Sequence, residues 1–106
     1  NTQLITDKIY DFIKNNKYDE ALAYIEQLKI KNYDIDYIKK IESIVYGYYA
    51  TFLYDNRQFD KAKSVSNLAI RRNKDNYDAI AIKNQVYVDI YLNSVGNYKK
   101  MAGSKI

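Results

Sequence analysis

The chain has 106 residues and a formal net charge of +4 at pH 7, with 47% hydrophobic and 28% charged residues. These values are typical of one globular domain with a core of its own. Cysteine and histidine are absent, which excludes disulfides, thiolate chemistry, histidine-based metal sites and histidine-dependent catalytic triads. We therefore expect no metal and no cofactor.

Three further features concern the setting of the chain. No apolar run approaches the roughly 18 residues of a membrane span. The lack of cysteine fits a reducing compartment, so a cytoplasmic location is expected. The chain begins with Asn1 rather than methionine, and we expect residues 1–106 to be a single domain from a larger protein.

Apolar side chains recur at steps of three and four residues, which is the spacing of one helix face. Proline is absent and only 3 glycines occur, so the composition favours helices with short turns. Asp34 or Asp36, and later Asp75 or Asn76, have side chains that can cap a helix start. The pattern predicts five helices and the beginning of a sixth, at about residues 2–16, 18–30, 34–54, 59–72, 76–93 and from 98 onward.

The stretch 46–73 carries the clearest pair of helices. One face of its first helix presents the aromatic residues Tyr46 and Tyr49 with Ala50 and Leu53, and the second helix begins at Phe59. Alanines allow close backbone approach, while the rings fill the space beside them. Neither helix can bury its stripe alone, so a stack of helical hairpins is expected.

Three junctions between a turn and a helix are similar: residues 16–21, 57–62 and 96–101. Each has polar residues, then an aromatic residue, two mostly charged residues and a small or flexible apolar residue. The copies are 41 and 39 residues apart, and self-similarity at such a period indicates a helical repeat. The repeat predicts hairpins at about residues 2–31 and 34–73, followed by a fifth helix and the start of a sixth at about residues 76–106.

The chain resembles the tetratricopeptide repeat (TPR) family. The best match is Tyr46-x2-Tyr49-Ala50-x2-Leu53 followed by Phe59-Asp60-Lys61-Ala62, and residues 5–28 give a weaker copy. The spacing exceeds the family's usual period of about 34 residues, Lys8 and Ser66 stand at usually apolar positions, and no proline closes a repeat. The resemblance implies an all-α fold of antiparallel helical hairpins stacked as a short right-handed solenoid of about five to six helices.

The resemblance also implies a non-enzymatic protein- or peptide-binding module, such as a scaffold or a peptide-sensing domain of a larger regulatory protein. The first helix of each hairpin would line a concave groove, where tyrosine supplies rigid contact area and polar side chains supply hydrogen bonds. A homodimer is compatible with so short an array. The expected groove residues are Asp7, Tyr10, Lys14, Ile44, Tyr48, Thr51, Asp55, Ile82, Gln85 and Asp89.

Other interpretations remain open. The same stripe can be an ordinary solvated face, and the 13 tyrosines can reflect AT-rich codons rather than function. Helical repeats can also bind single-stranded RNA, although a bias of −1 in residues 1–53 against +5 in residues 54–106 is modest for nucleic acid. Carboxylate catalysis by Asp55 with Asp89 has no supporting motif. The basic residues that would serve nucleic acid are Arg57, Arg71, Arg72, Lys74, Lys99 and Lys100.

Overall fold

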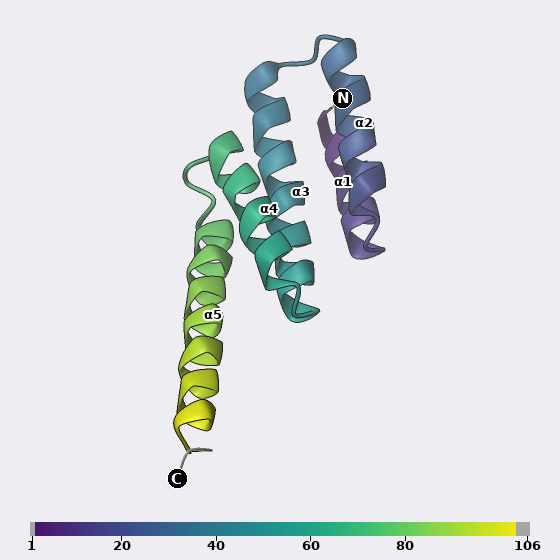
Figure 1. The fold of residues 1–106 in the computed structure, drawn as a ribbon. Helices are drawn as coiled ribbons and strands as arrows, with labels where there is room; N and C mark the ends of the chain where they lie inside the picture. The colour runs from purple at the N-terminus through teal and green to yellow at the C-terminus, as the bar shows by residue number, and fades with distance from the viewer. Residues whose placement is uncertain (1, 104–106) are drawn as a thin grey trace.

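The computed structural model describes the backbone of residues 2–103 and the side chains of residues 2–96. This part of the chain contains five α-helices and no strand (Figure 1), which confirms the all-α prediction. The last residues of the predicted domain, 104–106, lie outside it. The helices are α1 (Thr2–Lys14), α2 (Tyr18–Ile30), α3 (Ile35–Asp55), α4 (Phe59–Arg72) and α5 (Tyr77–Gly103).

The first three helices end in the same way. Asn16, Asn32 and Arg57 have positive φ angles of 58°, 61° and 62°, the left-handed conformation that commonly terminates a helix. The amide of the following residue then donates to the carbonyl five residues earlier, with N···O distances of 2.8, 3.3 and 2.9 Å. The turns at Asn16 and Arg57 are thus equivalent, in agreement with the first two of the three predicted junctions.

The third predicted junction is wrong. Helix α5 runs without interruption from Tyr77 to Gly103 through the expected turn at residues 94–97, so no sixth helix begins at Tyr98. Gly96 does not have a positive φ, and a glycine within a helix costs only about 1 kcal/mol relative to alanine. Without proline or a left-handed residue, nothing local stops the helix.

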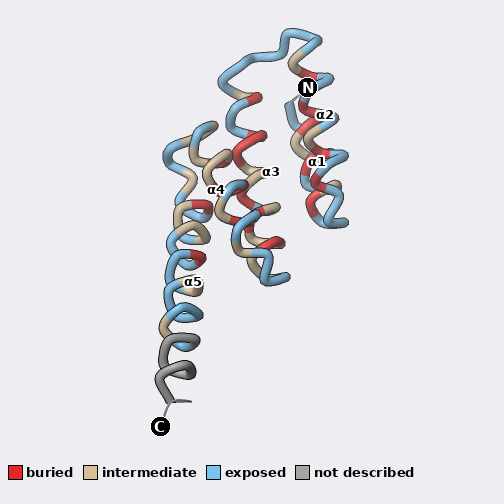
Figure 2. Tube along the Cα trace, in the orientation of Figure 1, coloured by how far each residue is buried: buried red, intermediate tan, exposed pale blue. Residues whose placement is uncertain are grey.

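Helix α3 is shared by two hydrophobic cores. Its first half packs with α1 and α2 around isoleucines such as Ile9, Ile25 and Ile38, all at most 1% exposed. Its second half packs with α4 and α5 around Leu53 and Val86. In addition, α3 contacts both α1 and α5, so each odd-numbered helix packs beside the next odd-numbered helix in the chain. Figure 2 shows buried residues along the facing sides of α1 to α4, and residues 87–96 of α5 are mostly exposed.

A buried carboxylate connects the two cores. Glu42 on α3 is 3% exposed and forms ion pairs with Lys29 of α2 at 2.9 Å and Arg72 of α4 at 2.5 Å. Hydrogen bonding to Glu42 raises the pKa of Arg72. Because Lys29 and Arg72 come from different helices, the two ion pairs connect α2 and α4 to the same residue of α3.

Lys8 also has a structural explanation. Its ammonium group lies 4.5 Å from the centre of the Tyr24 ring, a distance suited to a cation–π interaction.

Within residues 2–103, no helix has both the length and the apolar character needed to cross a bilayer.

Candidate functional site

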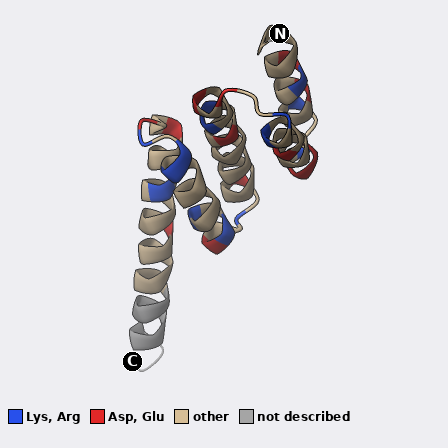
Figure 3. Ribbon diagram, turned by 90° about the horizontal axis from the view of Figure 1, so that it is seen from above, with Lys and Arg blue, Asp and Glu red and all other residues tan. Residues whose placement is uncertain are grey.

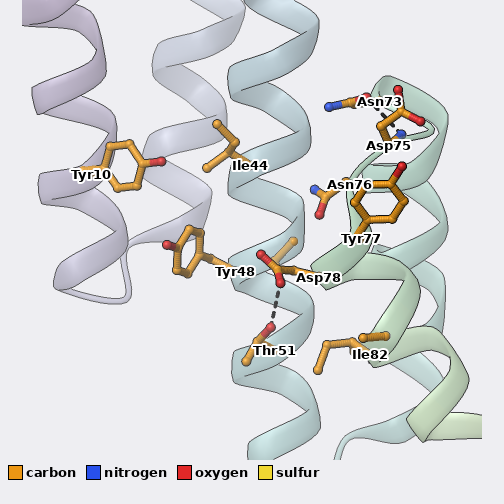
Figure 4. Close-up of a pocket in the computed structure, with 12 residues that line it drawn as sticks. Tyr10, Ile44, Tyr48, Thr51, Asn73, Asp75, Asn76, Tyr77, Asp78 and Ile82 are labelled. Carbon is orange, nitrogen blue, oxygen red and sulfur yellow. Dashed lines mark hydrogen bonds between the residues drawn. The ribbon is translucent and has the colours of Figure 1, made fainter.

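A groove of about 750 Å³ lies between α1, α3 and the start of α5 (Figure 4). One side presents Tyr10 from α1 and Tyr48 from α3, whose rings meet edge to face with centroids 6.2 Å apart. Both rings are open to solvent, 42% and 47% exposed respectively. Five of the ten expected groove residues border this space: Tyr10, Ile44, Tyr48, Thr51 and Ile82.

The polar groups of α1 and α3 that border the groove take part in some hydrogen bonds within the protein. The Thr51 hydroxyl donates to the carbonyl of Gly47, one turn earlier, at 3.0 Å, which leaves its oxygen free to accept. Partial burial and then the proximity of Tyr48 raise the pKa of Tyr10. The Tyr10 phenol is therefore neutral at physiological pH and can donate a hydrogen bond to a ligand.

The opposite wall comes from the connection between α4 and α5, which sequence reasoning missed as part of the site. Asn73, Asp75, Tyr77 and Asp78 border the groove there, with Tyr77 73% exposed. The available signal was the predicted cap at Asp75 or Asn76, because a capped helix start presents its preceding loop to solvent, and loops carry many binding residues.

Asn76 fixes this wall to α3. Its side-chain oxygen accepts from the amide of Ala79 at 3.1 Å, which caps α5. Its amide nitrogen donates to the carbonyl and hydroxyl oxygens of Ser43 at 3.1 and 2.9 Å. Gly47 leaves room for this side chain, since a Cβ atom there would lie 3.1 Å from the Asn76 nitrogen. Gly47 is therefore a position of close packing between α3 and the start of α5.

The remaining expected residues do not join the groove. Asp55 and Asp89 border a second space of about 360 Å³ near the end of α3. A hydrogen bond from the Tyr54 hydroxyl to Asp89 crosses from α3 to α5 there and raises the pKa of Tyr54. Asp55 and Asp89 therefore border a different space from the other five residues, and the single continuous groove stays a prediction.

Three further predicted residues border neither of these spaces. Asp7, Lys14 and Gln85 are exposed on α1 and α5, and the Asp7 carboxylate accepts from the Gln3 amide at 2.8 Å. These residues lie on exposed faces of their helices, but neither cavity extends to them.

The groove is acidic although the chain is basic overall. Asp75 and Asp78 border it, whereas none of its lining residues is lysine or arginine. Near the end of α4, Arg72 pairs with Glu42. Arg57 lies over the Phe59 ring, and the side chains of Lys99 and Lys100 lie outside the described residues. Basic and acidic residues are interspersed along the described helices rather than gathered in one patch (Figure 3).

Within the described residues, no group of three or more acidic residues is arranged to hold a metal ion. Geometrically, the groove offers accessible aromatic rings, hydrogen-bonding groups and two carboxylates, a composition suited to binding an extended chain. Comparisons with family models, curated proteins and solved structures found no match to this chain.

Proposed function

We propose that this chain is a non-enzymatic protein- or peptide-binding module, built as a short right-handed TPR-like array within a larger protein. The equivalent turns at Asn16 and Arg57 support the repeat. So do Ala21 and Ala62, which follow the two turns at equal distances and are both 0% exposed. Two helical hairpins with the same turn geometry are what a stacked repeat requires.

The observation that carries the binding proposal is the convergence of Tyr10, Tyr48 and Thr51 on one groove. Accessible tyrosines provide a large contact area at low cost in conformational entropy. The groove is open along α3, so an extended peptide can enter it without unfolding the wall. The acidic lining disfavours a nucleic-acid backbone at this site, because phosphate and carboxylate groups repel one another.

Panning a random linear-peptide display library against the purified chain tests this function. The test variant combines Tyr48→Ala with Thr51→Ala, and the matched control is Tyr87→Ala, which removes a ring of similar exposure, 50%, away from the groove. Circular dichroism establishes that each variant is folded.

Peptides selected on the wild-type chain should bind the double variant at least about tenfold more weakly, the effect of losing one aromatic anchor. Their affinity for the Tyr87 control should be unchanged. Equal affinities for the double variant and the wild type would remove the groove from the binding surface.

A further inference from the structure

We propose that the groove takes a cationic peptide segment, with a lysine or arginine side chain placed between Asp75, Asp78 and the tyrosine rings. This inference rests on the proposed peptide-binding function and adds the chemistry of the ligand. Three features of the groove support it: the negative charge of its lining, the lack of cationic partners for its carboxylates, and the lack of a cation over its tyrosine rings.

The charge of the groove is opposite to that of the whole chain. The protein carries a formal charge of +4, yet the groove lining contains two carboxylates and no cationic side chain. A concave surface with low-dielectric walls concentrates the field of its charges. The charge of the groove lining therefore favours a cationic ligand.

The two carboxylates have no cationic partner among the described residues. The ion pairs in that part of the chain all involve Glu26 or Glu42. The backbone amide of Asp75 donates to the Asn73 side chain at 3.1 Å, which fixes the loop but leaves the Asp75 carboxylate open. Asp78 lies in the first turn of α5, where a negative charge favours the helix dipole. The Asp78 carboxylate can interact favourably with the helix dipole and still form an ion pair with a ligand.

The groove rings are likewise uncovered. Elsewhere on the molecule lysines lie over tyrosines: Lys8 over Tyr24 at 4.5 Å and Lys63 over Tyr87 at 5.4 Å. Within the described residues, no lysine or arginine lies over the rings of Tyr10, Tyr48 or Tyr77.

An ammonium or guanidinium group from a ligand can occupy these free ring faces. The carboxylates are available in the same cavity, because Asp75 and Asp78 border the groove together with Tyr10, Tyr48 and Tyr77. A lysine or arginine side chain satisfies both kinds of partner at once, whereas an acidic or purely apolar segment satisfies at most one.

The test compares selections from the same random linear-peptide library on three proteins. These are the wild type, the variant with Asp75→Asn and Asp78→Asn, and a control with Asp36→Asn and Asp60→Asn. Asp36 and Asp60 are exposed in the first turns of α3 and α4, so the control changes the net charge equally and also removes acidic residues near helix starts.

Peptides from the wild type and the control should be enriched in lysine or arginine relative to the library, and those from the groove variant should not. A synthetic wild-type-selected peptide should lose about tenfold in affinity for the groove variant, as expected for two partly exposed ion pairs. Its affinity for the control should stay the same.

The outcomes distinguish this inference from the function beneath it. Selected peptides that require Tyr48 and Thr51 but lack cationic enrichment would overturn the cationic ligand and leave peptide binding intact. Selected peptides indifferent to Tyr48 and Thr51 would overturn both. Equal loss of affinity in the groove variant and the control would show only a nonspecific charge effect and would also reject the inference.

Discussion

The fit between Gly47 and Asn76 determines whether the α5 wall of the groove can form, and substitution of Gly47 by alanine tests it. In an isolated helix this change stabilises by about 1 kcal/mol. Here the new Cβ atom would lie 3.1 Å from the Asn76 side-chain nitrogen, closer than a comfortable van der Waals contact. Asn76 cannot withdraw freely, because Ser43 and Ala79 hold it from two sides.

The expected change in the free energy of unfolding follows from the hydrogen bonds of Asn76, which must lengthen when its side chain moves away from the new methyl group. Asn76 makes three hydrogen bonds, each contributing roughly 0.5–1.5 kcal/mol. Weakening them costs about 2 kcal/mol in sum, which exceeds the propensity gain at Gly47. We therefore expect Gly47→Ala to lower the free energy of unfolding by about 1 kcal/mol net. With Asn76→Ala already present, the same change should raise it by about 1 kcal/mol.

Urea denaturation followed by circular dichroism measures all four members of this double-mutant cycle. The expected coupling energy is about 2 kcal/mol, well above the usual error of additivity for independent sites. Asn76→Ala alone should cost at least about 2 kcal/mol, because it removes all three hydrogen bonds of the side chain, including the helix cap. If Gly47→Ala had the same effect with and without the Asn76 side chain, the reasoning about the groove wall would be refuted.

Three other substitutions have definite expected outcomes. Ser66 has a buried hydroxyl with no hydrogen-bond partner among the described residues, so Ser66→Ala should raise the free energy of unfolding in urea by about 1 kcal/mol; a decrease would contradict this. Glu42→Gln should lower it by about 2 kcal/mol, less than the 3–5 kcal/mol of a fully buried pair, because Lys29 and Arg72 are 31% and 35% exposed. Gly96→Ala should slow amide exchange in distal α5, since the new Cβ would meet no described side chain within 4 Å; faster exchange would indicate a turn there.

The first four helices were predictable because local signals and long-range packing agree. Asp34 caps α3 through its side chain, as one of the two residues expected there, and the alanines Ala50 and Ala62 are fully buried at the expected positions. The similarity of residues 94–97 to the other turns did not predict where α5 ends, because α5 continues through them to Gly103. Residues 94–97 resemble a turn in composition, but helix termination at Asn16 depends on a left-handed residue, and Gly96 remains helical.

The groove was only partly predictable for a similar reason. Periodicity identifies the face of α3 that carries Tyr48 and Thr51, because successive turns of one helix have a fixed geometry. It cannot place the loop before α5, whose path depends on the hydrogen bonds of Asn76 to Ser43, 33 residues away in sequence. The hydrogen bond between Tyr54 and Asp89 is likewise a contact between side chains on separate helices.

The most direct test of peptide binding in the groove is a nuclear magnetic resonance titration. The ¹⁵N-labelled chain is titrated with the tightest lysine- or arginine-containing peptide from the display selection. We expect the largest amide shifts at Tyr10, Tyr48, Thr51 and Asp78, on the three helices that border the groove. Shifts confined to the exposed face of α5 around Tyr91, with none in the groove, would contradict the assignment of this groove as the binding site.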